Sequence, residues 1–236
     1  MNVTGAPFRP RVIPALLLRR NGLVKTTRFD DARYLGDPIN VVRIFNDKGV
    51  DELILVDIDA SREGTATDHA LLEEIASEAF VPVATGGGIR TLEQIEERLA
   101  LGFEKVVVNT AAVEDPALID RAAREFGSST IAVAVDVRAR RFSRREVVTR
   151  GGRQKTGLDP VAHAVDLVRR GAGEIIIQSV DRDGSMGGYD LDLIGEVAAS
   201  VDVPVVALGG AGSVEDLAAA IAAGAAAVAA GSLFVF

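Results

Sequence analysis

A single acidic residue ends a strongly apolar run near the middle of the chain. Residues 131–135 are all alanine, valine or isoleucine, and Asp136 follows them. Such a run is typical of a parallel strand buried on both faces, and the C-terminal ends of these strands carry the chemistry of α/β barrels. A carboxyl group at that position can accept or donate a proton. Asp136 is therefore the predicted catalytic residue.

Two further groups of residues have the chemistry of anion sites. Gly87 and Gly88 combine with Asn109 and Thr110 in the first group. The second group comes from three predicted strand ends: Asp183, Gly184, Gly209, Gly210, Gly231 and Ser232. Glycine lets backbone N–H groups approach an anion, and amide or hydroxyl side chains add donors. A single glycine pair is usually only a turn, but two such groups predict a substrate phosphorylated at both ends. Lys25 is a candidate for a further phosphate or sugar contact.

Four charged residues stand at the opposite, N-terminal ends of predicted strands. They are Arg11, Glu52, Lys105 and Glu174. Because side chains alternate along a strand, Lys105 shares a face with Asn109, and Glu174 shares one with Gln178. The four charges are thus expected to point into the interior and to form a ring of ion pairs. Taken by itself, this chemistry favours a plug of paired charges over a gate for a small neutral molecule.

The elements that must position these residues alternate between strand and helix. Strands are predicted at 12–18, 53–58, 81–85, 106–108, 131–137, 175–180, 203–208 and 226–230, and helices at 38–48, 68–78, 91–101, 116–126, 160–170, 191–200 and 214–223. Eight such units most simply close into a (β/α)₈ TIM barrel, with a doubly wound sheet as the alternative. Only residues 231–236 follow the last strand, so the closing C-terminal helix is expected to be short or absent.

The two halves of the chain repeat one another. The segment 52–59 (ELILVDID) aligns with 174–181 (EIIIQSVD), and the glycines at 86–88 align with those at 209–212. This predicts two half-barrels of four βα units each. The same correspondence pairs Leu17 with Asp136, allowing for loops of different length.

Composition excludes several classes of function. The 236 residues fit a single barrel domain, 1–236, and the net charge of −8 gives no basic surface for nucleic acid or anionic lipid. There is no cysteine, and the two histidines, His69 and His163, fall on predicted helices, where we expect surface roles. No metal site or cofactor is therefore predicted. The chain shows no signal-peptide core or apolar run of about 18 residues, so a cytoplasmic protein is expected.

Several of these motifs together resemble the cyclase subunit of imidazole glycerol phosphate synthase. They are AVDVR around Asp136, TGGGI at 85–89, NTAAV at 109–113, SVDRDG at 179–184 and GGAG at 209–212. The resemblance extends over residues 11–236. It implies a barrel that receives ammonia from a glutaminase subunit at its N-terminal face and uses it on a bis-phosphorylated ribonucleotide at the other end. It also implies that the four charged residues are an ammonia gate, that Asp136 is one of two catalytic aspartates, and that substrate contacts come from Lys25, Gly88, Asn109, Thr110, Asp183, Gly184, Gly210 and Ser232.

The sequence departs from this family at the second acid. Leu17 stands where the other aspartate belongs, and Gln178 and Leu208 replace hydroxyl residues. Members with such a leucine resemble paralogues that supply ammonia to a sugar amidotransferase in surface-polysaccharide (lipopolysaccharide) synthesis. We therefore expect a cyclase-like, ammonia-receiving subunit that uses ammonia on a phosphorylated substrate or passes it on. The alternatives are a full histidine-pathway cyclase-lyase and a non-catalytic scaffold that activates the glutaminase.

Overall fold

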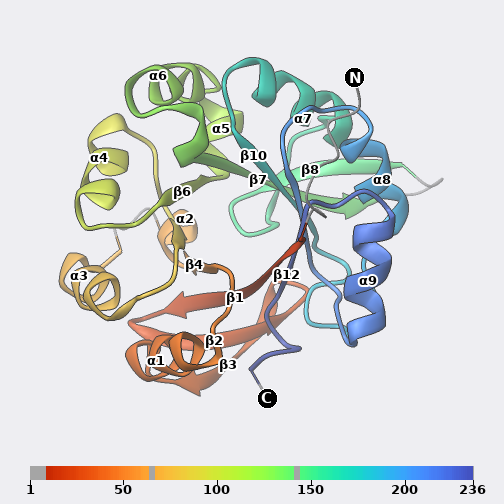
Figure 1. The fold of residues 1–236 in the computed structure, drawn as a ribbon. Helices are drawn as coiled ribbons and strands as arrows, with labels where there is room; N and C mark the ends of the chain where they lie inside the picture. Colours follow the sequence, from red (N-terminus) through yellow and green to blue (C-terminus); the bar gives the residue numbers. More distant parts are fainter. Residues whose placement is uncertain (1–8, 64–66, 141–143, 236) are drawn as a thin grey trace, which may run out of the picture.

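Eight parallel strands form a closed barrel in the computed structural model, which describes residues 9–63, 67–140 and 144–235. The strands are β1 (Arg11–Arg19), β4 (Leu53–Asp57), β5 (Val83–Gly86), β6 (Lys105–Val108), β7 (Ile131–Ala139), β10 (Glu174–Ser179), β11 (Val205–Leu208) and β12 (Ala227–Ala230). They are ordered β10-β11-β12-β1-β4-β5-β6-β7, and pairing of β10 with β7 closes the ring (Figure 1). The predicted TIM barrel is confirmed, and the doubly wound sheet is excluded.

Helices surround the ring of strands (Figure 1). The longer ones are α1 (Pro38–Lys48), α3 (His69–Glu78), α4 (Leu92–Ala100), α6 (Ala117–Phe126), α7 (Pro160–Arg169), α8 (Leu191–Ala198) and α9 (Val214–Ala222), and the short ones are α2 (Ala60–Glu63), α5 (Thr110–Glu114) and the 3₁₀ turn η1 (Ser128–Thr130). Asp37 and Asp159 cap α1 and α7 directly before a proline, which suits the first turn of a helix. Up to Val235, no helix follows β12. In the part of the chain that is described, no helix has the length and apolarity needed to cross a membrane.

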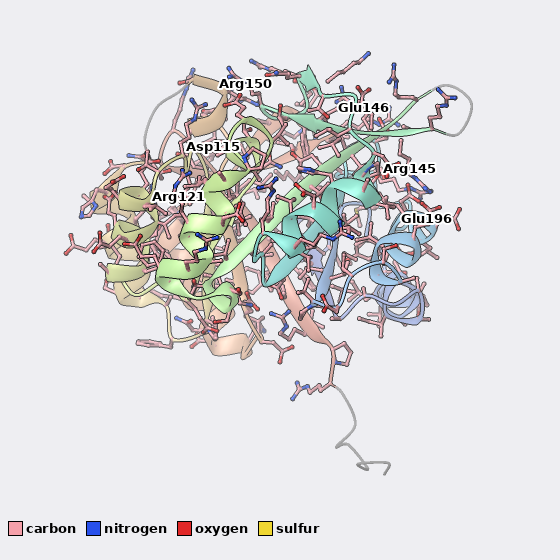
Figure 2. All side chains as sticks on the ribbon, turned by 90° about the horizontal axis from the view of Figure 1, so that it is seen from above. Asp115, Arg121, Arg145, Glu146, Arg150 and Glu196 are labelled. Atoms are coloured by element: carbon pink, nitrogen blue, oxygen red, sulfur yellow. The ribbon has the colours of Figure 1, made fainter. Side chains whose placement is uncertain are left out.

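Two antiparallel hairpins extend the barrel strands, and the sequence did not predict them. β2 (Gly22–Thr27) pairs antiparallel with β1, and β3 (Asp30–Gly36) pairs antiparallel with β2. The reversal is possible because Arg20 and Asn21 both take positive φ angles, as two-residue hairpin turns require. β8 (Arg145–Thr149) and β9 (Gln154–Lys155) extend β7 in the same way. Figure 2 shows Arg150 and Glu146 on this extension, at the C-terminal end of the barrel strands. Arg145, at the start of β8, forms an ion pair with Glu196 on α8.

The internal repeat is visible in the element boundaries. β5, α4 and β6 in the first half correspond to β11, α9 and β12 in the second, each displaced by the 122 residues that separate Glu52 from Glu174. Thr91 caps α4 and Ser213 caps α9 at the same displacement. The equivalent parts of the two halves therefore share local structure as well as sequence.

Alanine, valine and isoleucine side chains pack in the barrel interior, and further apolar clusters lie between the strands and the helices. The interior cluster consists of Ile13, Ala15, Ile54, Ala84, Val107, Ala132, Ile176, Val206, Ala227 and Ala229. Outside the ring, His163 on α7 is only 8% exposed, so the expected surface role for this residue is wrong. Burial lowers the pKa of His163, with a smaller opposing effect of Asp166, and favours its neutral form.

Candidate active site

The four charged residues at the strand N-termini meet in one closed ring of ion pairs, which we call the floor ring. Arg11 donates hydrogen bonds to Glu52 and to Glu174. On the other side, Lys105 Nζ lies 3.2 Å from Glu52 Oε1 and 3.1 Å from Glu174 Oε2. Burial alone would lower the pKa of Arg11, but its hydrogen bonds and charge interactions with Glu174 and Glu52 raise it. The structure confirms the predicted ring of ion pairs, in which each buried carboxylate has two cationic partners.

A cavity of about 110 Å³ begins directly above the floor ring and opens at the other end of the barrel. Its lining includes Ile54, Val107 and Ile176, which stand two residues after Glu52, Lys105 and Glu174 in extended chain. Two residues along a strand return to the same face. The cavity therefore connects the layer above the floor to the strand C-termini.

Asp136 lines this first cavity and is 6% exposed. Burial raises the pKa of the carboxyl group to about 7; a hydrogen bond with the Asn109 side chain opposes this rise, and the charge of Asp183 adds to it. A carboxyl group with a pKa near neutrality can both donate and accept a proton under ordinary conditions. The predicted catalytic residue thus has the environment that proton transfer needs.

The first group of predicted anion-site residues lines the same cavity, and we call it the first cradle: Gly87, Gly88, Asn109 and Thr110. Gly87 and Gly88 have φ angles of 118° and 68°. A Cβ atom on Gly87 would lie 2.6 Å from the backbone oxygen of Asp57, so only glycine fits there. The Thr110 hydroxyl donates to Asn109 Oδ1 and accepts from the Arg150 N–H at 3.2 Å.

The second group lines a neighbouring cavity of about 30 Å³ and, together with Lys25, forms the second cradle: Asp183, Gly184, Gly209, Gly210, Gly231 and Ser232. Asp183 accepts hydrogen bonds from the Thr26 hydroxyl at 2.8 Å and from the Phe29 N–H at 3.1 Å. Burial raises the pKa of this carboxyl group, against the effect of these hydrogen bonds and one from Gln178. Asp183 therefore also fixes the β2–β3 hairpin, which carries Lys25, against the loop after β10.

The wall between the two cavities is mainly apolar. Ala15, Leu17, Thr26 and Leu208 line both cavities, so a ligand that spans the two cradles must pass this wall.

Leu17 pairs with Val56 on β4, and Asp136 pairs with Gln178 on β10. Val56 and Gln178 are related by the same displacement of 122 residues, so Leu17 and Asp136 occupy equivalent positions. Asp136 is the one acid among the described residues that line the first cavity, and Leu17 stands where the internal symmetry offers a place for a second.

Several residues of the first cavity were missed by the sequence analysis. They are Thr26 and Phe29 from the β2–β3 hairpin, Arg62 from α2, Arg90 after β5, and Gly151 between β8 and β9. All of them lie outside the barrel strands, where apolar periodicity gives no signal. Arg62 and Arg90 nevertheless place two cations beside the first cradle in a chain whose net charge is −8.

The fold and the site define a TIM barrel with an interior cavity, a buried acid, Asp136, at its open end and two glycine-rich cradles beside that acid. A family profile described as "Histidine biosynthesis protein" matches residues 11–236. The chain belongs to this family and is a homologue of the HisF subunits of imidazole glycerol phosphate synthase.

Relatives cover most of the chain. The "Putative imidazole glycerol phosphate synthase subunit hisF2" of Pseudomonas aeruginosa is 48% identical over 229 residues, covering 97% of this chain and 91% of the relative. The "Putative imidazole glycerol phosphate synthase subunit HisF" of Leptospira interrogans is 46% identical over 234 residues, with the same shares covered. The "Imidazole glycerol phosphate synthase subunit HisF" of Alkaliphilus metalliredigens is 43% identical over 208 residues, or 88% of this chain and 82% of the relative.

Proposed function

We propose that this chain is a cyclase-type subunit that receives ammonia through the floor ring and uses it on a bis-phosphorylated substrate held by the two cradles. The supporting observation is the first cavity, which extends from the layer above the floor ring to Asp136 and the first cradle. The names of the relatives point to the imidazole glycerol phosphate synthase reaction of histidine biosynthesis. In this proposal, a glutaminase subunit docks at the N-terminal face of the barrel and supplies the ammonia.

Each group of residues has a separate task in this proposal. The cradles bind the two phosphates through backbone N–H groups and through Thr110, Lys25 and Ser232. The buried position of Asp136 keeps its pKa near neutrality, so that it can move a proton during imine formation, bond cleavage and ring closure. The apolar lining keeps bulk water from the ammonia path.

Leu17 supports a second candidate function, in which the barrel passes ammonia to a separate acceptor. A leucine cannot transfer a proton, and the wall that it forms with Leu208 offers no other acid. In that case the acceptor would be a sugar amidotransferase of surface-polysaccharide synthesis. A third candidate, a scaffold that only activates the glutaminase, predicts no passage through the floor. Turnover of the ribonucleotide with free ammonium supports the first candidate over both others.

The floor is tested by a charge-neutral pair of substitutions, Lys105→Met with Glu52→Gln. Removing Lys105 alone would leave buried carboxylates undercompensated, at a cost of about 3–5 kcal/mol, whereas the pair leaves Arg11 joined to Glu174. We expect the ammonia transferred per glutamine hydrolysed to fall at least severalfold, while turnover with free ammonium is retained. The measurement is the ratio of aminated product to glutamate with the glutaminase bound.

The matched control is Arg121→Met with Asp115→Asn, an exposed ion pair on the outside of the barrel. This control should leave the ratio unchanged. If the floor variant also transfers ammonia stoichiometrically while it binds the glutaminase, the floor ring is a plug and not a gate.

A further inference from the structure

Arg62 is a partly buried cation on α2 that lines the first cavity and lacks a full set of partners. Its Nη2 donates to the Phe29 carbonyl at 2.7 Å. Its Nε is buried and has no hydrogen-bond partner among the described residues. Gly151 packs against the guanidinium, since a Cβ atom there would lie 2.4 Å from Nε. A buried donor without a partner is uncommon in folded proteins and calls for an explanation.

Two residues of the first cradle, Gly87 and Thr110, contact segments that surround Arg62. On one side, Gly87 packs on the backbone of Asp57, whose Oδ1 accepts from the Asp59 and Ala60 N–H groups at the start of α2. On the other side, the hydrogen bond from the Arg150 N–H to Thr110 holds the β8–β9 turn, which places Gly151 on the guanidinium. Arg62 is thus enclosed by structures that also position Gly87 and Thr110.

The electrostatic surroundings of Arg62 suit an incoming anion. Burial lowers the pKa of Arg62, the charges of Arg153 and Arg19 lower it further, and Asp59 and Asp30 partly offset these effects. None of the ion pairs that the described residues form includes Arg62, although neighbouring Arg19 is paired with Asp59. A phosphate would supply the missing negative charge and would accept from two nitrogens of one guanidinium.

From these contacts we infer that Arg62 is an additional phosphate-binding residue of the first cradle. It adds a charged, forked donor to the backbone N–H groups of Gly87 and Gly88. This inference rests on the proposed function, because it takes the first cradle to be a phosphate site. The inference also makes the two cradles chemically different, because the first would bind phosphate with an arginine and the second with Lys25.

Titration of ¹⁵N-glycine-labelled protein with inorganic phosphate tests the inference, because each cradle has its own reporters. Gly87 and Gly88 report on the first cradle, and Gly209 and Gly210 report on the second. Arg62→Gln keeps a neutral donor for the Phe29 carbonyl and so preserves the local structure. We expect this variant to weaken phosphate binding at Gly87 and Gly88 at least about tenfold. Binding at Gly209 and Gly210 should be unchanged.

Two further variants sharpen the comparison. Arg62→Lys retains the charge but not the fork, and it should weaken binding at the first cradle by a smaller factor. Arg43→Gln removes one exposed guanidinium, paired with Glu78 on the outside of the barrel, and controls for net charge. It should leave both glycine pairs at wild-type affinity.

Three outcomes would overturn the inference. Equal phosphate affinity of Arg62→Gln and wild type at Gly87 and Gly88 would remove Arg62 from the site while leaving the cradle intact. Equal weakening at both glycine pairs would show that Arg62 only holds the β2–β3 hairpin, which contributes Lys25 to the second cradle. If phosphate shifts neither glycine pair in the wild type, the cradles are not phosphate sites, and the proposed function fails with them.

Discussion

Replacing Asp136 by asparagine is expected to lower ammonium-dependent turnover of the bis-phosphorylated ribonucleotide by about 10²–10⁴-fold, the usual contribution of a general acid–base residue. Asparagine has the shape of the aspartate and can keep the contact with Asn109, but it cannot carry a proton between substrate atoms. The measurement is the steady-state kcat with saturating ammonium. Because Leu17 offers no substitute acid, no other group on the shared wall can compensate.

The same substitution should stabilise the fold at alkaline pH, which separates a chemical defect from a structural one. Burial raises the pKa of Asp136 from 3.8 to about 7, so the folded state holds a proton that the unfolded state has released between these values. Wild-type stability therefore falls as pH rises from about 4 to 7, by up to about 4 kcal/mol. The Asp136→Asn variant has no such titration, so it should gain stability relative to wild type over this range. Lower stability of the variant at pH 8 would indicate structural damage instead.

Leu17→Asp is expected to raise ammonium-dependent turnover by about 10²-fold or more, because it restores an acid at the position equivalent to Asp136. Leu17 lines both cavities and is partly exposed, so a carboxylate there can be hydrated. The measurement is kcat with ammonium and the ribonucleotide. Leu17→Asn is the matched control, since it has the same shape without the proton-transfer chemistry.

The absence of a gain in Leu17→Asp would carry information of its own. It would mean that the pocket differs from a cyclase site beyond one residue, with Gln178 and Leu208 the first positions to examine. The second candidate function, in which ammonia passes to a separate acceptor, would then be favoured. A gain in both the aspartate and the asparagine variants would instead point to a polarity effect and not to acid–base chemistry.

The strands, the floor ring and the cradles could be predicted because each follows from a local rule. Alternation along parallel strands places Lys105 and Asn109 on one face, and the structure has both in the barrel interior. The glycine pairs recur at one displacement, and the packing of Gly87 on Asp57 is repeated by Gly209 on Ser179. These contacts form within the repeated βα unit, so they can be predicted from the sequence repeat.

The residues that were missed depend on contacts between distant loops. Phe29 enters the first cavity because Arg20 and Asn21 turn the chain from β1 into β2, and Asp183 binds the following β2–β3 turn, which contains Phe29. Arg62 enters it from a four-residue helix that has no apolar stripe. His163 is buried because one face of α7 packs on the barrel. The residue type alone would not predict this burial. No local pattern reports these long-range contacts.

A crystal structure with the bis-phosphorylated ribonucleotide bound would test the central claim most directly. The account predicts one phosphate on the N–H groups of Gly87 and Gly88, the other on Gly210 and Ser232, and the reacting atoms between them within hydrogen-bond distance of Asp136. A ligand bound through only one phosphate, or one whose reacting atoms lie away from the Asp136 carboxyl group, would contradict it.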